Sequence, residues 1–551
     1  MVVFEAVGKG FGHGKAPGGR WGRGAASLLL TVALALPPAA GIAQTAPPSA
    51  PYAQAVAVAV AEDALLADYY RARNYDTLWT GAEDAARRAA LFAALDGAAA
   101  HGLPVARYDA AALRAAFAAA VTEGDRGRLE VRMTRAFLDY ASDVATGVLV
   151  PEEADAAIHR EVTRLDPLRL LAQVDRGDAS ALLRSLPPKA PEYARLMKEK
   201  LSLEARIAAG GWGAPVMAGS LAPGDTGADV VALRDRLMAK GYLRRSATAI
   251  YDRDMQAAVQ RFQIDHGLTA DGRATADTLA EINISPEDRV KSIVVAMERL
   301  RWMHDTVRGP RHIWVNLPDF SSKIVDHGKV TFQTRAVIGK NVPDQRSPEF
   351  SDEMDHLVIN PSWGVPRSII VKEYLPLLQR NPNAVSHLQV IDRNGRVVPR
   401  GAVNFAAYSA RSFPFGLRQP PSDGNALGKV KFMFPNQYNI YLHDTPAKEL
   451  FDHEVRAYSH GCIRLADPFD FAYALLAAQT DDPKGFFHGH LESDKETTVR
   501  FDEKLPVHLV YFTAWPTAKG DMTYRRDIYG RDARIFDALT EAGVALRGVQ
   551  G

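Results

Sequence analysis

The spacing of hydrophobic residues changes along this chain, and that change restricts its fold more than any other feature. From residue 53 to about residue 208, apolar residues recur at helical spacing. Beyond residue 311, short runs rich in β-branched and aromatic side chains predict strands. A chain of 551 residues, at roughly 100–200 residues per domain, holds about three or four domains. We therefore expect a multidomain α+β protein, with strands at 313–317, 323–325, 331–338, 357–359, 440–443 and 506–512.

A glycine-rich break separates the first helical region from a second, smaller one. Residues 210–215 read Gly-Gly-Trp-Gly-Ala-Pro, which ends a helix and is typical of a linker. Three further helices are predicted at 229–240, 252–266 and 275–283, because turn residues separate these periodic segments. We expect a three-helix bundle over residues 221–283, followed by a longer helix at 286–302.

The N-terminal segment has the pattern of an export signal. Lys and Arg residues precede an almost wholly apolar run at 25–36, and small residues at 41–43 offer a cleavage site. A membrane-spanning helix needs about 20 apolar residues, and this run is shorter. We expect residues 1–43 to be a signal peptide that directs the protein to the periplasm or cell envelope. An uncleaved N-terminal anchor is the alternative.

Charge and cysteine content exclude several classes of function. The chain has 66 Lys and Arg against 65 Asp and Glu, so it lacks the basic excess with which proteins neutralise nucleic-acid phosphates. Cys462 is the single cysteine and cannot form an internal disulfide, a thiolate zinc site or an iron–sulfur centre. His488 and His490 lack the further ligands that would complete a metal site. We expect no nucleic-acid partner, no metal and no cofactor.

Cys462 lies in the densest cluster of reactive side chains. A lone cysteine most often packs as a small hydrophobe, but a neighbouring histidine can activate its thiol as a nucleophile. His443 and His460 are both close in sequence. In the strand predicted at 440–443, Ile440 and Leu442 alternate with Tyr441 and His443, so His443 should face away from the aliphatic side.

The residues flanking the cysteine suggest how a carbonyl substrate would be held. His460 lies two residues before Cys462, so an extended backbone would place both side chains on one face. Gly461 permits close approach of a substrate, and the N–H groups of Gly461 and Cys462 could form an oxyanion hole. Arg464 could bind a substrate carboxylate or, alternatively, pair with Asp467.

This arrangement resembles a known family. A histidine, fifteen residues, Ser-His-Gly-Cys, an apolar residue and Arg is similar to the signature of YkuD-type L,D-transpeptidase catalytic domains. The resemblance implies that His443 is the general base, Cys462 the nucleophile and His460 a supporting residue. It also implies that the backbone carbonyl of Asp444 orients the imidazole of the base. The residues expected to contact the substrate are Arg464, Ser459, Trp363 and Tyr441.

The resemblance extends over most of the chain. Residues 221–283 resemble the peptidoglycan-binding type 1 module, and several other stretches are similar to the large periplasmic YcbB-type enzymes. These enzymes imply a helical scaffold at 53–208, a catalytic domain at 311–515 with a capping insertion at 375–432, and a C-terminal extension at 516–551. The similar stretches are 75–79, 101–104, 360–369, 443–446 and 527–532.

The family implies a specific reaction on peptidoglycan. Its members form a cysteine thioester with a tetrapeptide stem, release D-Ala and transfer the acyl group to an amine, which makes 3-3 cross-links. The implied partners are stem peptides, a wall-attached protein as another acceptor, and carbapenem β-lactams as inhibitors. The alternatives are a hydrolase of the same fold and a non-catalytic wall-binding scaffold. Sortases also combine His, Cys and Arg, but their Arg lies on a separate strand.

Overall fold

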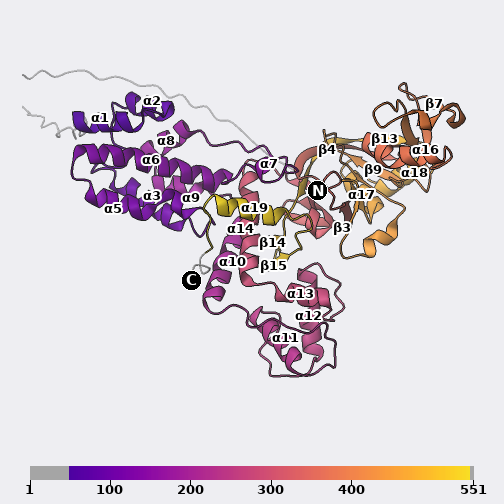
Figure 1. Cartoon of the computed structure of the whole chain (residues 1–551), viewed down its shortest axis with the longest axis horizontal. Helices are drawn as coiled ribbons and strands as arrows, with labels where there is room; N and C mark the ends of the chain where they lie inside the picture. The colour runs from indigo at the N-terminus through magenta and orange to yellow at the C-terminus, as the bar shows by residue number, and fades with distance from the viewer. Residues whose placement is uncertain (1–48, 547–551) are drawn as a thin grey trace, which may run out of the picture. The chain divides into compact units, whose positions relative to one another are not determined.

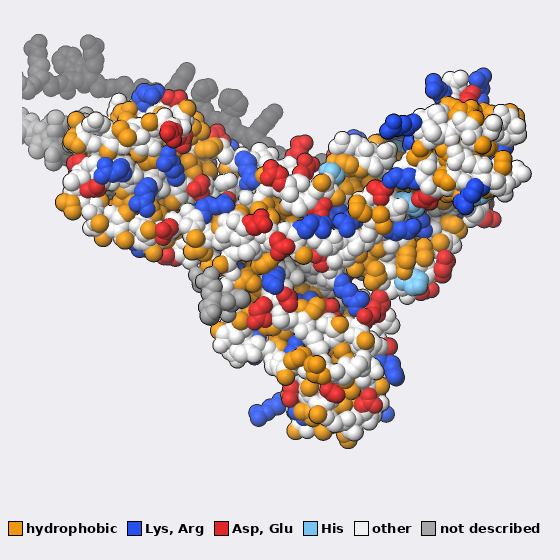
Figure 2. All heavy atoms as spheres, in the orientation of Figure 1, with side chains coloured by type: hydrophobic (Ala, Val, Ile, Leu, Met, Phe, Trp, Pro, Cys, Tyr) orange, Lys and Arg blue, Asp and Glu red, His pale blue; other side chains and the backbone are white. Residues whose placement is uncertain are grey.

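The computed structural model describes residues 49–546, so the expected signal segment at 1–43 lies outside them. Helices fill the described chain as far as residue 302, and strands dominate from residue 311 onward (Figure 1). The expected multidomain α+β architecture is confirmed. No helix within residues 49–546 is both long and apolar enough to cross a bilayer. Figure 2 shows basic and acidic side chains intermixed on the face in view.

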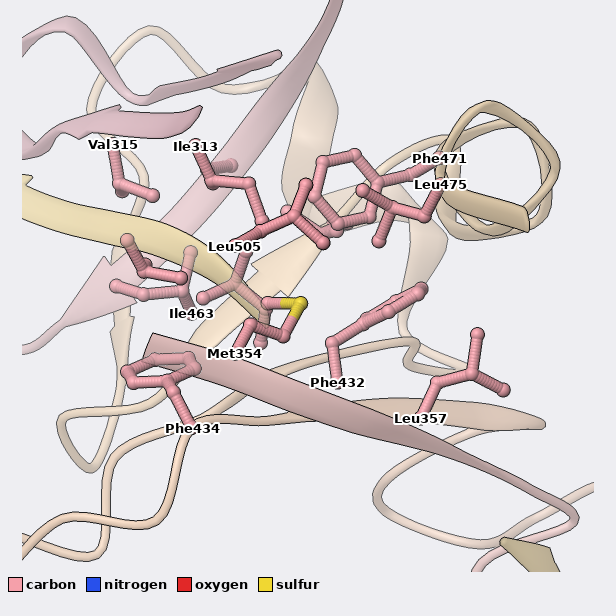
Figure 3. Packing of buried hydrophobic residues seen from close by; sticks show 14 of the residues in the cluster. Ile313, Val315, Met354, Leu357, Phe432, Phe434, Ile463, Phe471, Leu475 and Leu505 are labelled. Carbon is pink, nitrogen blue, oxygen red and sulfur yellow. The ribbon is translucent and has the colours of Figure 1, made fainter. Parts of the chain in front are cut away.

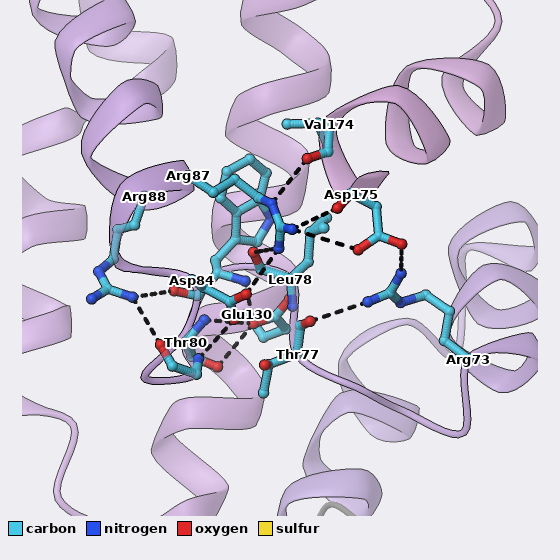
Figure 4. A network of polar contacts seen from close by, with 12 residues as sticks. Arg73, Thr77, Leu78, Thr80, Asp84, Arg87, Arg88, Glu130, Val174 and Asp175 are labelled. Atoms are coloured by element: carbon cyan, nitrogen blue, oxygen red, sulfur yellow. Dashed lines mark hydrogen bonds and ion pairs between the residues drawn. The ribbon is translucent and has the colours of Figure 1, made fainter. Parts of the chain in front are cut away.

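The N-terminal helical region packs around a buried carboxylate. Glu130 is fully buried and accepts hydrogen bonds from the backbone N–H groups of Leu78, Trp79 and Thr80 at 2.7, 3.1 and 3.0 Å. Figure 4 shows how these contacts anchor the loop before α3 to the central helix α6. The helices are α1 Ala50–Ala59, α2 Ala64–Ala72, α3 Ala85–Gly97, α4 Val105–Tyr108, α5 Ala110–Ala119, α6 Glu123–Thr146, α7 Pro151–Ala154, α8 Pro167–Arg176, α9 Ala179–Ser185 and α10 Pro191–Ala208.

The three helices of the bundle form where the sequence predicts them. Asp252 and Thr275 cap the second and third helices, and each accepts a hydrogen bond from a backbone N–H three residues on. Leu233 and Phe262 belong to a hydrophobic core that this bundle has to itself. The predicted helix that follows is also present. The helices are α11 Ala228–Ala239, α12 Arg253–Asp265, α13 Ala276–Asn283 and α14 Pro286–Trp302.

The strand-rich domain is built on a nine-stranded sheet that closes on itself. Its strands are β1 Arg311–Asn316, β2 Ser321–Asp326, β3 Lys329–Gly339, β4 Phe350–Ile359, β9 Val430–Met433, β10 Leu442–His443, β11 Ala457–Ser459, β12 Ile463–Leu465 and β13 Thr497–Val510. The order is β11-β3-β12-β10-β9-β4-β13-β1-β2, and β2 also pairs with β3. The β1–β13, β10–β12 and β3–β11 pairs are parallel, and the others are antiparallel.

One predicted strand is shorter than expected. The sequence pattern favours a strand over 440–443, but β10 contains only Leu442 and His443. The Asn436 side chain donates a hydrogen bond to the Ile440 carbonyl at 2.8 Å, and Asn439 has a left-handed φ of 55°. A turn therefore occupies the residues before β10, and side-chain alternation alone cannot reveal it.

The main core lies inside this sheet and includes side chains from the helices that pack against it. Figure 3 shows Met354, Phe432 and Leu505 from three strands facing Phe471 and Leu475 of α17. Each fully buried side chain of this size contributes about 1.5–3 kcal/mol relative to exposure. The core thus fixes the strands that carry the residues expected to be catalytic. The remaining helices here are η1 Leu317–Asp319, η5 Lys448–Asp452, α17 Pro468–Leu476 and α18 Pro483–Leu491.

A second core marks a cap inserted between β4 and β9. Its sheet has the order β5-β8-β6-β7. The insertion expected at 375–432 differs from this cap in its limits, because the cap core begins at Trp363 while residues 430–433 form strand β9 of the main sheet. The cap elements are β5 Trp363–Gly364, α15 Arg367–Ile369, η2 Ile370–Tyr374, α16 Leu375–Arg380, β6 Gln389–Ile391, β7 Val397–Val398, η3 Arg400–Ala402, η4 Phe405–Ala407 and β8 Gly416–Gln419.

The residues expected as a C-terminal extension at 516–551 are described as far as residue 546, and among them a helix packs against α14. They include β15 Met522–Tyr524 and α19 Arg531–Glu541, and β14 Ala514–Pro516 precedes them. Ile535 and Leu539 belong to the same buried cluster as Leu300 of α14. Arg299 of α14 pairs with Glu349 and also with Asp532, 3.0 Å away, and all three side chains are buried. This network joins α14 and α19 to the residue just before β4.

Candidate active site

The residues singled out from the sequence gather in one cleft of about 430 Å³, lined by the main sheet and the cap. The strand ends and loops of the sheet supply its reactive groups, and the cap supplies the opposite wall. Gly461 and Asp444 belong to the same loops without lining the cleft. The expected site residues that do line it are Cys462, His443, His460, Arg464, Ser459, Trp363 and Tyr441.

Cys462 sits in a bend between β11 and β12. Gly461 has a φ of +113°, a value that a residue with a Cβ rarely adopts, so the bend requires glycine here. The Ser459 hydroxyl closes the bend by donating a hydrogen bond to the Cys462 carbonyl at 2.6 Å. The partly exposed thiol points to the Asn439 carbonyl at 3.6 Å. Burial raises the pKa of the Cys462 thiol to about 11.

His443 is buried at the end of β10 and held by its neighbour. Its Nδ1 lies 2.5 Å from the Asp444 carbonyl, which can only accept, so Nδ1 carries the proton and Nε2 is free to act as a base. Burial, together with the nearby Arg464 guanidinium, lowers the pKa of His443 to about 3. Within the described residues, no hydrogen bond joins Cys462 to His443. At neutral pH the pair is therefore a neutral imidazole and a protonated thiol.

The expected oxyanion donors are only partly available. The Gly461 N–H donates to the Ser459 hydroxyl at 3.2 Å, so the expectation that it faces a substrate is not met. The Asp444 N–H is likewise occupied, by the Val430 carbonyl at 2.9 Å. The Cys462 N–H has no partner in the described part of the chain. Tyr441, which the sequence predicts as a substrate contact, adds two donors, because its backbone N–H and its hydroxyl both lie near the Cys462 sulfur.

His460 does not lie on one extended face with Cys462, because the backbone bends between them. Its side chain points instead to the cap, where Nε2 lies 2.6 Å from a carboxylate oxygen of Glu373. Glu373 belongs to helix η2, and its neighbour Lys372 forms an ion pair with Asp344. Two polar contacts thus join the cap to the main domain at the edge of the cleft.

Arg464 lies in the cleft on β12, and the alternative pairing with Asp467 is absent. Asp467 instead accepts a hydrogen bond from the Thr334 hydroxyl at 2.8 Å. The Arg464 Nε is buried without a partner among residues 49–546. On the cap side, Trp363 belongs to the cap core, against which Tyr441 packs. Burial raises the pKa of Tyr441 well above its usual value, so its hydroxyl stays protonated.

Several supporting residues were missed by the sequence analysis. Ser347 donates a hydrogen bond to the Gly461 carbonyl at 2.6 Å and accepts one from the Gly339 N–H at 3.0 Å. The Tyr529 hydroxyl donates to the Gly339 carbonyl at 2.6 Å, and Arg531 donates to the Ser347 carbonyl at 2.9 Å. The similarity at 527–532 was the available signal, although it did not reveal which residues these side chains contact.

Comparison with known proteins assigns the parts of this chain to families. Residues 310–484, which hold His443 and Cys462, match the family model of the YkuD L,D-transpeptidase catalytic domain. The chain contains an L,D-transpeptidase catalytic domain. Residues 226–282 match a peptidoglycan-binding domain, and residues 64–199 match a scaffold domain. The family resemblance drawn from the Ser-His-Gly-Cys motif is thereby confirmed, and the L,D-transpeptidase domain lies beside a peptidoglycan-binding domain in one chain.

Proteins similar to this chain are found among curated proteins and solved structures. A Haemophilus influenzae protein named "Putative L,D-transpeptidase" is 32% identical over 249 residues. That match covers 44% of this chain and 49% of the relative, so the chain spans about half the length of the relative. L,D-transpeptidase structures from Stackebrandtia nassauensis and Xylanimonas cellulosilytica are each 16% identical, with TM-scores of 0.22 and 0.16. They match over 97% and 100% of their own lengths and 54% of this chain.

Proposed function

We propose that this protein is a cysteine L,D-transpeptidase that makes 3-3 cross-links in peptidoglycan. The observation that carries the proposal is a single cleft that combines the Cys462 thiol, the His443 imidazole and unpartnered hydrogen-bond donors. A general-base mechanism suits the neutral charge states of this thiol and imidazole. The peptidoglycan-binding domain in the same chain favours the same substrate and a location in the cell envelope. Export through an N-terminal signal is part of the proposal.

The first half-reaction forms a thioester. The thiol turns from the Asn439 carbonyl towards Nε2 of His443, which takes its proton, and the sulfur attacks the carbonyl before the terminal D-Ala. The Cys462 N–H and the Tyr441 hydroxyl stabilise the developing oxyanion. The C–N bond then breaks, and His443 returns the proton to the leaving amine of D-Ala. Arg464 is placed to hold a carboxylate of the donor stem.

The second half-reaction transfers the acyl group. The side-chain amine of a second stem attacks the thioester carbonyl, the C–S bond breaks, and the thiol regains its proton. A wall-attached protein could supply the amine in place of a stem. If water attacks instead, the same site acts as a carboxypeptidase or releases a wall-attached protein. The nature of the acceptor therefore separates the transferase from the hydrolase.

The test is product analysis. The purified chain is incubated with peptidoglycan rich in tetrapeptide stems, the glycan strands are digested, and the fragments are identified by mass spectrometry. We expect free D-Ala and dimers linked between two diamino acid residues. Tripeptide monomers alone would identify a hydrolase. Unchanged fragments, together with no reaction at Cys462 by a thiol probe, would identify a non-catalytic wall-binding scaffold.

A further inference from the structure

We propose that Glu373 and His460 form the binding site and proton acceptor for the amine that resolves the acyl-enzyme. This inference rests on the proposed transferase activity and specifies its acceptor as a primary amine that arrives as an ammonium ion. It assigns different tasks to the two imidazoles of the cleft. His443 serves the thiol, and His460 serves the acceptor.

The contact between Glu373 and His460 fixes which imidazole nitrogen can act as a base. Glu373 reaches the cleft from the cap, and its Oε1 lies 2.6 Å from Nε2 of His460. A carboxylate only accepts hydrogen bonds, so Nε2 carries the proton and Nδ1 can take up another. In the described part of the chain, no residue occupies that Nδ1. The two side chains are 41% and 29% exposed, so an incoming acceptor can reach both.

A third group that lines the same cleft also needs a hydrogen-bond donor. The Oε1 atom of Gln345 is buried and has no partner within residues 49–546, and Gln345 lines the cleft with Glu373 and His460. A buried acceptor without a donor is costly, so such a group points to a ligand that supplies one. An ammonium carries a positive charge and three N–H donors. It matches one carboxylate, one imidazole nitrogen and one amide oxygen.

Other groups in the cleft have the opposite character. Arg464 and Tyr441 present hydrogen-bond donors near the thiol, which suits the carboxylate and carbonyl oxygens of the acyl donor. Glu373 and Gln345 present acceptors, which suit the N–H groups of an amine. The cleft thus contains two complementary sets of groups, and the reaction brings together two substrates with these needs.

The proposed proton transfers balance over the second half-reaction. A lysine-like amine, with a pKa of about 10.4, is almost fully protonated at neutral pH and cannot attack a thioester in that form. Nδ1 of His460 takes one proton, and Glu373 stabilises the resulting imidazolium. The neutral nitrogen forms the new C–N bond as the C–S bond breaks. A second proton passes through His443 to the Cys462 sulfur, the third stays on the new amide, and His460 releases its proton to water.

The charged groups around His460 leave Glu373 as its partner. Asp344 is also on this side of the cleft, but Lys372 pairs with it. That contact, more than the charge of His460, holds the pKa of Asp344 below its usual value. The Arg464 guanidinium lines the same cleft as His460. Glu373 is therefore the carboxylate positioned to favour both the ammonium and the imidazolium.

The experiment measures the two half-reactions separately in the full chain with Glu373→Gln. Acyl-enzyme formation from a tetrapeptide stem is followed by intact mass and D-Ala release. Transfer is followed with an amine-bearing stem and with hydroxylamine, which is uncharged at neutral pH. We expect acylation and hydroxylamine transfer at wild-type rates, and transfer to the amine reduced about tenfold or more. This deficit should shrink as the pH rises towards about 10, because the amine is then neutral.

The matched control is Glu496→Gln, which replaces an exposed carboxylate bonded to Ser362 at 2.6 Å, just before the cap. We expect wild-type transfer to both nucleophiles in this variant. Wild-type amine transfer by Glu373→Gln would overturn the acceptor site, and so would equal losses with amine and hydroxylamine. A wild-type enzyme that releases D-Ala but transfers to no amine would instead overturn the transferase activity, and the acceptor site with it.

Discussion

At the scale of single residues, the cleft keeps its two proposed reactive groups uncharged. Burial raises the pKa of Cys462 and lowers that of His443. Both shifts disfavour a thiolate–imidazolium pair. Nucleophilic attack then needs proton transfer during the reaction rather than before it. The Asp444 carbonyl supports this by fixing the proton on Nδ1 of His443 and leaving Nε2 as the base.

The first residue-scale prediction concerns the nucleophile. A carbapenem should add one covalent equivalent to the wild-type chain, and Cys462→Ala should abolish the adduct while keeping the fold. His443→Ala should slow adduct formation by about 10²–10⁴-fold, because the thiol loses its base and stays protonated. Intact mass spectrometry measures the adduct, and circular dichroism checks the fold of each variant. An adduct on Cys462→Ala would rule this residue out as the nucleophile.

The second residue-scale prediction concerns Tyr441. Tyr441→Phe removes a hydroxyl that faces the Cys462 sulfur and keeps the ring that packs against the cap core. We expect carbapenem acylation to slow by about 10²-fold, the usual effect of losing one oxyanion donor, with little change in stability. Stopped-flow acylation and thermal melting measure the two effects. Wild-type acylation kinetics would show that the hydroxyl does not stabilise the oxyanion.

The sequence predicted the residues that share one short motif, but not those that meet them through the fold. Cys462, His443 and Arg464 could be named because their types and spacing carry the chemistry. Glu373, Ser347 and Tyr529 come from distant segments, and only folding brings them near the loop that holds Cys462. The occupied N–H of Gly461 was also unforeseeable, since it depends on the rotamer of Ser459.

At the scale of secondary-structure elements, helices were easier to predict than strands. The helix predicted at 286–302 has the same bounds as α14, because Ser285 caps it and Pro286 occupies its first turn. Strand β10 is shorter than its alternating pattern because an Asn-mediated turn precedes it. The cap limits were misplaced because β9 lies next to the cap in sequence but pairs with β4 in the main sheet.

The element-scale prediction concerns the cap. Leu378 is fully buried in the cap core, and Leu378→Ala should destabilise the cap by about 2–5 kcal/mol. Hydrogen exchange should accelerate in the cap and stay slow in strands β4 and β13. Turnover of a stem substrate should fall more than alkylation of Cys462 by a small probe, because the cap forms one wall of the cleft. Equal losses would indicate that the cap is needed for folding of the main domain.

At the scale of the whole molecule, buried charges and a separate binding domain set the organisation. Arg299 joins Glu349 and Asp532 in a buried network between α14, α19 and the start of β4. Removing the arginine would leave the buried Asp532 without a positive partner, and Glu349 with Arg531 alone, 3.3 Å away. Such networks hold elements together mainly through the cost of breaking them.

The first whole-molecule prediction tests that network. Arg299→Met should lower the free energy of unfolding by about 3–5 kcal/mol, because it leaves the buried Asp532 without a positive partner. Arg71→Met is the matched control, since Arg71 pairs with Asp68 on the surface and both side chains are mostly exposed. That control should cost about 1 kcal/mol or less. Urea unfolding measures both variants, and similar losses would show that the network is not a stabilising tie.

The second whole-molecule prediction concerns the three-helix bundle. Deleting residues 214–284 should weaken sedimentation with insoluble peptidoglycan and leave Cys462 reactive, because the bundle has its own core. Arg289 pairs with Glu281 in a buried contact, so the deletion should also carry Arg289→Gln to avoid an unpaired charge. The full-length chain with Arg289→Gln is the control. Unchanged sedimentation would remove the wall-binding role from the bundle.

The contacts that support the loop around Cys462 also determine when during synthesis this loop can take its final form. Tyr529 and Arg531 reach back to Gly339 and Ser347, and Ser347 in turn holds the Gly461 carbonyl. Tyr529 and Arg531 are synthesised long after Gly339 and Ser347, and also later than Cys462 itself. A nascent or truncated chain that stops before residue 527 therefore contains Cys462 without the contacts that shape its loop. Maturation of the site therefore waits until translation has passed residue 531.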